Sequence, residues 1–153
     1  MAYNGAGIYG IYNVVDNKIY IGKSTHIHNR LSSHRSCFNR KMGNSIMYQE
    51  PIEKFVFFVI LKMSDMEYQQ YGDFFESIFI IQARETMGLY NSSKSHDSAL
   101  TTVLYFFKVR ENIRYGIRSA TGGVEPYVLK TMKKTTREEF MQRLNMLRKW
   151  DED

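Results

Sequence analysis

The sequence contains almost no cysteine, and its hydrophobic segments are short. Its 153 residues include a single cysteine, Cys37, so no intrachain disulfide can form and no zinc site of several thiolates is available. The apolar runs at residues 55–61 and 74–81 are far shorter than the roughly 20 residues that span a bilayer. No basic segment followed by an apolar one marks the N-terminus. These absences predict a cytoplasmic protein without a membrane partner.

Acidic residues are also in the minority. Lys and Arg number 21 against 16 Asp and Glu, which leaves a net charge of +5. A hydrophobic fraction of 43% and a charged fraction of 24% are typical of a folded chain rather than a disordered one. We therefore expect one compact domain with a small appendage, and an anionic partner such as a nucleic acid.

Two tripeptides near the N-terminus carry most of the functional information. Gly7-Ile8-Tyr9 and Tyr20-Ile21-Gly22 are separated by ten residues, which include several β-formers and the turn-forming pair Asp16-Asn17. This pattern predicts a β-hairpin. Arg30 and His34 follow four residues apart, so a helix would place a cation beside an imidazole on one edge.

The middle of the sequence predicts a buried strand and a long helix. Residues 55–61 form a continuous run of apolar β-formers, which suits a strand covered on both faces. Ser64 and Glu67 have the spacing of a capping box, so a helix should begin there and run toward Gly88. Glu76 lies inside this helix among aromatic and aliphatic residues, where a carboxylate must be paired or reach a cavity.

Two stretches without a clear period divide the chain. Residues 36–53 predict mostly loop, with a short helix at 46–49. The stretch at 92–98, rich in Ser and Lys, predicts a surface connection. We therefore expect two parts, a module at 1–93 and an extension at 94–153.

The extension carries most of the positive charge. Residues 94–153 have 12 basic and 8 acidic residues, a difference of +4, whereas residues 1–93 have 9 and 8, a difference of +1. The pattern predicts a strand with a basic face and a last helix with an apolar stripe, through which a homo-oligomer or another partner could dock. The basic side chains are candidates for contact with nucleic-acid phosphates: Arg114, Arg118, Lys130, Lys133 and Lys134.

Read together, the two tripeptides and the polar residues behind them resemble the GIY-YIG endonuclease family over residues 5–93. The resemblance implies an α+β fold with a small three-stranded antiparallel sheet flanked by helices, to which this chain adds a C-terminal strand and helix. It also implies a DNA endonuclease that hydrolyses phosphodiesters with a divalent metal. The catalytic residues expected on this basis are Tyr9, Tyr20, Lys23, Arg30, His34, Glu76 and Asn91.

Each chemical need of phosphodiester hydrolysis has a candidate residue. Glu76 is the expected ligand of one Mg²⁺ or Mn²⁺, hard ions that keep several waters and need few protein oxygens. Arg30 is suited to bridging phosphate oxygens. As a general base, Tyr9 would need a cation that lowers its pKa, and Lys23, directly after the second tripeptide as in some relatives, is expected to supply it. Asn91 is expected to hold the site together by hydrogen bonds.

Two assignments stay open at this point. His34 rivals Tyr9 as the base because imidazole titrates near neutrality, and both His34 and Tyr20 are candidates for orienting the attacking water. The first motif also has an overlapping alternative, Gly10-Ile11-Tyr12. In a hairpin with an even-numbered loop, paired residue numbers have an odd sum, so Tyr20 would share a face with Tyr9 while Tyr12 points away. An odd loop or a bulge would reverse this parity.

The expected function is that of a small stand-alone phage or bacterial endonuclease, acting in a mobile element, in restriction or against competing DNA. Several homing relatives carry another histidine in the loop before the third strand, where this chain has Gly43-Asn44, and this argues against a close homing enzyme. The alternatives are a non-catalytic nucleic-acid-binding module of the same fold and a nuclease for repair or branched DNA.

Overall fold

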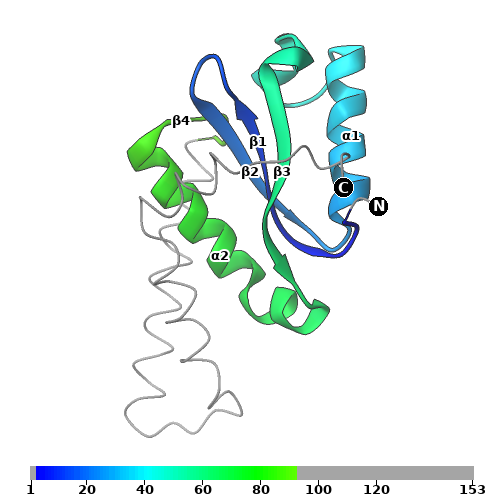
Figure 1. The fold of residues 1–153 in the computed structure, drawn as a ribbon, viewed down its shortest axis with the longest axis vertical. Coiled ribbons are helices and arrows are strands. Elements are labelled where there is room, and N and C mark those ends of the chain that lie inside the picture. Colours follow the sequence, from blue (N-terminus) through cyan, green and yellow to red (C-terminus); the bar gives the residue numbers. More distant parts are fainter. Residues whose placement is uncertain (1–2, 93–153) are drawn as a thin grey trace, which may run out of the picture.

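A computed structural model of the protein describes residues 3–92, except for the side chains of Glu85 and Thr86. Figure 1 shows the elements along the chain. They are β1 (Ala6–Asn13), β2 (Lys18–Ser24), α1 (Ile27–Arg40), the single-turn 3₁₀ helices η1 (Ile46–Gln49) and η2 (Ile52–Lys54), β3 (Phe55–Met63), α2 (Asp65–Thr86) and β4 (Gly88–Leu89).

The strands form one sheet in the order β3-β1-β2-β4. β1 is antiparallel to both of its neighbours, whereas β4 runs parallel to β2. The expected α+β class is confirmed, but the sheet is four-stranded and mixed rather than three-stranded and antiparallel. The difference arises because the chain leaves α2 and returns along the free edge of β2, where the amides of Gly88 and Tyr90 donate to the carbonyls of Asn17 and Ile19.

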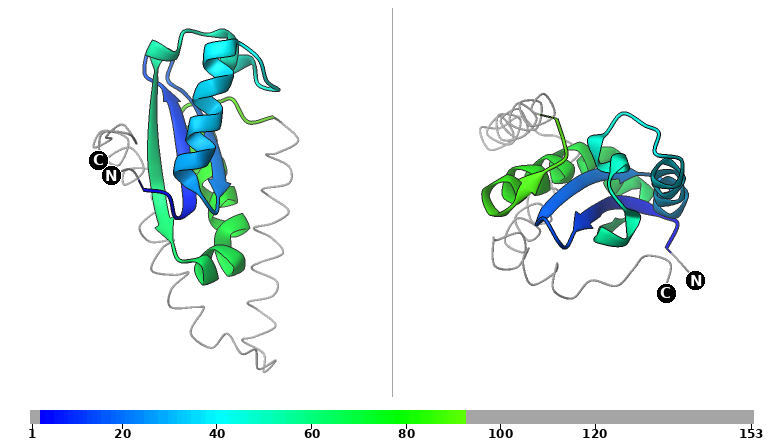
Figure 2. Two further views of the ribbon diagram at one scale, coloured as in Figure 1. Left: turned by 90° about the vertical axis from the view of Figure 1, so that its right-hand side faces the viewer. Right: turned by 90° about the horizontal axis from the view of Figure 1, so that it is seen from above.

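The sheet lies between the two long helices, with α1 on one face and α2 on the other (Figures 1 and 2). Alternation along β1 divides its side chains between two cores, since Ile8 packs toward α2 while Tyr9 and Ile11 pack toward α1. The core on the α1 face contains the tyrosine of the first tripeptide, so part of the candidate chemistry lies on that face.

The β1–β2 register confirms the parity expected of an even-numbered loop. Tyr9 pairs with Gly22 and Ile11 with Tyr20, so every pair of residue numbers sums to 31. Tyr9 and Tyr20 therefore lie on the same face, with ring centroids 6.4 Å apart. Tyr12 contacts the opposite core and donates a hydrogen bond to Asn17, so the overlapping tripeptide does not reach the same face.

The glycines of the two tripeptides are explained by close approach of other groups. Gly7 has φ +154°, which L side chains rarely adopt, and a Cβ there would overlap the carbonyl oxygen of Leu61 on β3. A Cβ on Gly22 would overlap the hydroxyl end of the Tyr9 ring. The second tripeptide thus ends in glycine because the tyrosine of the first one lies across it.

The helices follow the sequence expectations closely. The Ser64 hydroxyl accepts from the Glu67 amide and the Glu67 side chain accepts from the Ser64 amide, so the capping box is confirmed. α1 continues to Arg40, further into the stretch expected to be loop, and η1 coincides with the short helix expected at 46–49. No helix within residues 3–92 is long and apolar enough to cross a membrane.

The expected C-terminal strand and helix, with the phosphate-contact candidates Arg114, Arg118, Lys130, Lys133 and Lys134, lie outside the described residues. So does the apolar stripe through which a homo-oligomer was expected to form.

The close approach at Gly7 makes a stability prediction. We expect Gly7→Ala to lower the free energy of unfolding by about 2–4 kcal/mol, because its methyl group would meet a main-chain carbonyl that cannot move alone. Gly88→Ala is the matched control, since the atoms nearest its Cβ belong to the flexible Lys18 side chain, and it should cost less than about 1 kcal/mol. Urea unfolding measures both values, and equal costs would contradict the explanation.

Candidate active site

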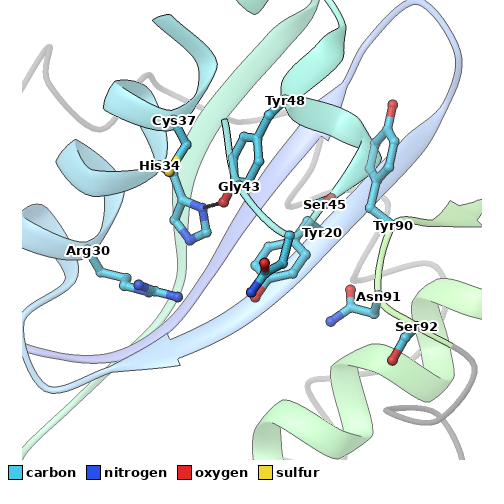
Figure 3. Close-up of a pocket in the computed structure, with 11 residues that line it drawn as sticks. Tyr20, Arg30, His34, Cys37, Gly43, Ser45, Tyr48, Tyr90, Asn91 and Ser92 are labelled. Atoms are coloured by element: carbon cyan, nitrogen blue, oxygen red, sulfur yellow. Dashed lines mark hydrogen bonds between the residues drawn. The ribbon is translucent and has the colours of Figure 1, made fainter. Parts of the chain in front are cut away.

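A cavity of about 450 Å³ opens between α1, the loop that follows it and the chain beyond β4. Figure 3 shows that side chains from all of these segments point into it. Four of the expected site residues, from β2, α1 and the end of the module, line it, and so does a tyrosine from η1. The lining residues are Tyr20, Arg30, His34, Cys37, Gly43, Asn44, Ser45, Tyr48, Tyr90, Asn91 and Ser92.

Helix α1 supplies the cation and the imidazole one turn apart, at different depths. Arg30 is exposed at the mouth of the cavity, whereas His34 is only 3% exposed. Burial, together with the nearby Arg30 charge, lowers the pKa of His34 to about 4. The imidazole is therefore neutral at pH 7, with one ring nitrogen that donates and one that accepts.

Both ring nitrogens of His34 are hydrogen-bonded to tyrosines. Its Nε2 lies 2.8 Å from the Tyr9 hydroxyl, and its Nδ1 lies 2.7 Å from the Tyr48 hydroxyl. The second of these bonds is drawn in Figure 3. Burial raises the pKa of Tyr9 above its usual range, and the Arg30 guanidinium opposes that rise. The two rival candidates for the base, Tyr9 and His34, are thus directly bonded to each other.

Tyr20 completes the aromatic group around this imidazole. Its ring centroid lies 5.4 Å from that of His34, and the side chain is half-buried at the cavity wall. Figure 3 shows the ring in the middle of the cavity, between Arg30 and Asn91. A group bound at Arg30 would therefore meet the Tyr20 ring as well.

Asn91 extends the sheet with its side chain. Its Oδ1 accepts from the Ile21 amide at 3.0 Å, and its Nδ2 donates to the Ile21 carbonyl at 2.8 Å. The carboxamide thereby continues the ladder that β4 begins at Lys18 and Ile19. This fixes the end of the module to β2 at the point where Tyr20 enters the cavity.

A buried polar network fixes the opposite wall of the cavity. Asn13, fully buried at the end of β1, donates to Asp16, Glu50 and Tyr90, and its Oδ1 accepts two amides of the hairpin turn. The Tyr90 hydroxyl also donates to Glu50. Burial, followed by the bond to Glu50, raises the pKa of Tyr90 to about 12. The network ties the turn, the segment before β3 and the end of the module into one unit.

Lys23 does not lie where it was expected. It pairs with Ile8 across the hairpin, and its Nζ lies 3.0 Å from Asp73 of α2 and 5.2 Å from the Tyr68 ring centroid. The alternation of side chains along β2 directs it to the α2 face, away from Tyr9. The expectation that Lys23 lowers the pKa of Tyr9 is therefore wrong, because its charge acts on the acidic side chains of α2.

Glu76 is half-buried on α2 and does not line the cavity. Burial raises the pKa of Glu76 to about 7, Lys23 lowers it and Asp73 raises it. Residues 3–92 contain no group of three His, Cys, Asp or Glu side chains that could hold a metal ion on their own. A hard divalent cation held by one carboxylate, with water and phosphate oxygens as its other ligands, is compatible with this environment, because it would stabilise the charged form of a carboxylate that burial disfavours.

The sequence-predicted residues thus fall into two groups on the two sides of β2. Tyr20, Arg30, His34 and Asn91 line the cavity on the α1 side, and the fully buried Tyr9 lies behind them, hydrogen-bonded to His34. Lys23 and Glu76 are neighbours on the α2 side. Both groups meet β2 between residues 20 and 23, beside the edge that Asn91 covers at Ile21.

Comparison with known families identifies the family of this domain. A family model described as the GIY-YIG catalytic domain matches residues 5–91, which is more than half of the chain. The chain belongs to the GIY-YIG family. That domain is a nuclease domain, and this implies DNA as the substrate. Searches of curated proteins and of solved structures gave no match.

Several residues of the candidate site were missed from the sequence. Tyr48 lies in a stretch with no hydrophobic period, so nothing marked it as a partner of His34. Asn13 and Glu50 are ordinary turn and loop residues until the fold places them beside Tyr90. Only the turn-forming character of Asn13 could have drawn attention to it.

The raised pKa of Glu76 predicts a pH-dependent stability difference. Between about pH 4.5 and 7 the folded protein binds a proton that the unfolded chain does not, so a contribution present at low pH is lost as pH rises through 7. Glu76→Gln stays neutral, and its stability relative to the wild type should therefore increase by about 2–3 kcal/mol between pH 4.5 and 8.

Urea unfolding at a series of pH values measures this change. Glu53→Gln, an exposed glutamate before β3, is the matched control and should show no such trend. His34 is present in the wild type and in both variants, so its contribution to the pH dependence of the free energy of unfolding cancels when a variant is compared with the wild type. A Glu76→Gln difference that stays constant with pH would contradict the burial argument.

Proposed function

We propose that this GIY-YIG protein is a metal-dependent DNA endonuclease that hydrolyses phosphodiester bonds at the cavity beside β2. The observation that carries the proposal is the hydrogen bond of the Tyr9 hydroxyl to the neutral imidazole of His34, next to the exposed Arg30 guanidinium. A proton acceptor and a phosphate-binding cation thereby line one concave site, and the buried Tyr9 hydroxyl is hydrogen-bonded to that acceptor from behind.

Arg30 binds the phosphate in this proposal. Its guanidinium is permanently charged and forked, stands at the cavity mouth and can contact two phosphate oxygens at once. The DNA backbone would cross β2 beside Asn91, where β4 has ended. A DNA strand that crosses there would first meet the face of β2 that carries Tyr20 and then the face on which Lys23 and Glu76 lie. Both groups of site residues would therefore contact one substrate.

Tyr9 and His34 act together as the base. As the water oxygen forms its bond to phosphorus, a water proton passes to the Tyr9 oxygen while the Tyr9 proton passes to Nε2 of His34. The bond from phosphorus to the departing ester oxygen breaks, and that oxygen takes a proton from solvent. Phosphate binding neutralises the Arg30 charge that depresses the pKa of His34, so the imidazole becomes a better base when substrate is present.

Glu76 would hold one Mg²⁺ or Mn²⁺ on the α2 side of the same strand. Such an ion, when bound, stabilises negative charge on the phosphate and on the departing oxygen. Lys23, held by Asp73, adds a second positive charge beside Glu76. Asn91 and the Asn13 network act as positioning groups, because they fix the two walls between which the substrate lies.

We place the protein among small phage or bacterial endonucleases that act in mobile elements, in restriction or against competing DNA. The described module contains both the candidate base and the phosphate-binding cation. A non-catalytic DNA-binding module is the outcome that the cleavage test below would reveal.

Plasmid cleavage tests the proposed reaction. With supercoiled plasmid and Mg²⁺, we expect nicked or linear product from the wild type and at least a 100-fold lower rate from Arg30→Ala and from Glu76→Ala. Arg40→Ala on the same helix and the exposed Glu53→Gln are matched controls that should retain activity. Undiminished cleavage by both site variants would refute the assignment, and DNA binding without cleavage by the wild type would show a binding module.

The basic extension is proposed to contact the DNA backbone, and salt dependence tests this. Replacing Lys130, Lys133 and Lys134 by Gln should reduce the slope of log K against log salt by about 2–3 units, because each lost phosphate contact releases about one counterion fewer. Lys62→Gln is the control, since Lys62 lies on β3 at the opposite edge of the sheet from β4. Fluorescence anisotropy of a labelled duplex measures both slopes, and an unchanged slope in the triple variant would exclude these contacts.

A further inference from the structure

We propose that Tyr48 is a positioning residue that fixes His34 in the tautomer with its proton on Nδ1, so that Nε2 is free to take the proton of Tyr9. The inference rests on the proposed nuclease function for its kinetic consequence. Its structural part, the tautomer of His34, rests on the two hydrogen bonds of the imidazole and on the position of the Arg30 charge.

The Tyr48 ring is held rigidly. It is buried, and it packs edge-on against Phe38 with ring centroids 5.1 Å apart. On another side the backbone of Gly43 approaches so closely that a Cβ there would overlap the ring. A phenol clamped in this way presents its hydroxyl to Nδ1 of His34 at 2.7 Å without rotameric freedom to lose.

The surroundings of Tyr9 decide the direction of the hydrogen bonds. The Arg30 guanidinium has only donors, and it interacts favourably with the Tyr9 oxygen. The phenol proton is therefore directed away from Arg30, toward His34, and Nε2 acts as the acceptor. Because a neutral imidazole carries one proton, that proton lies on Nδ1 and is donated to the Tyr48 oxygen.

The far side of Tyr48 is compatible with this direction. The Cys37 thiol lies next to the Tyr48 hydroxyl at the cavity wall, and sulfur is a weak acceptor for the phenol proton. Each group then donates a hydrogen bond to the next, Tyr9 to His34 and His34 to Tyr48. When Nε2 takes the proton of Tyr9, the imidazolium keeps a stabilising bond to the Tyr48 oxygen, as the orienting group of a catalytic triad does.

The test compares the full chain with its Tyr48→Phe variant, which keeps the ring and its packing and removes only the hydroxyl. In ¹⁵N-histidine spectra at pH 7, the wild type should show His34 protonated at Nδ1, and the variant should show His34 shifted toward the Nε2-protonated form. A wild-type His34 protonated at Nε2, or a tautomer unchanged by the substitution, would overturn the proposal.

Kinetics provide the second readout. Tyr48→Phe should lower kcat for plasmid cleavage about 10- to 100-fold with KM changed less than about threefold, because the hydroxyl acts through His34 and not on substrate. Tyr12→Phe, which removes a tyrosine hydroxyl from the opposite face of β1, is the matched control and should leave both constants and the His34 spectrum unchanged. Should the wild type not cleave DNA, the nuclease proposal fails while the spectra still decide the role of Tyr48.

Discussion

A buried imidazole must satisfy both of its ring nitrogens, and His34 does so with two phenols from different parts of the fold. Tyr9 comes from the central strand and Tyr48 from a single-turn helix that follows α1. The site depends on this pair of bonds because it joins the sheet, α1 and the loop before β3 around one side chain. A buried polar group that loses its hydrogen-bond partners at such a position lowers the free energy of unfolding by several kcal/mol.

The sequence was sufficient wherever a short-range rule applied. The hairpin followed from its turn residues, and the parity of its loop put Tyr9 and Tyr20 on one face. The capping box placed the start of α2, and the spacing of Arg30 and His34 put both on α1. These features depend on neighbours within a few residues, so the local pattern contained the information.

The expectations that failed or were missed depended on packing between distant segments. β4 exists because the chain happens to return beside β2, and two residues carry no strand period. Lys23 is the exception, because its expectation failed on a local rule: it follows Gly22 in the sequence, and the alternation along a strand directs neighbouring side chains to opposite faces. Tyr48 reaches His34 across a segment of irregular backbone, where no periodic pattern marks a contact.

Burial disfavours the charged forms of His34 and Glu76, and it shifts their pKa values in opposite directions because one is a base and the other an acid. It lowers the pKa of His34 to about 4 and raises the pKa of Glu76 to about 7. Each group would be charged more readily if a partner of opposite sign entered, a phosphate beside Arg30 and His34 or a cation beside Glu76. In the proposed function, a phosphodiester accompanied by a divalent cation would supply both partners together, since the two groups flank one strand. The same burial would then make the charging of His34 and of Glu76 depend on the bound substrate and ion.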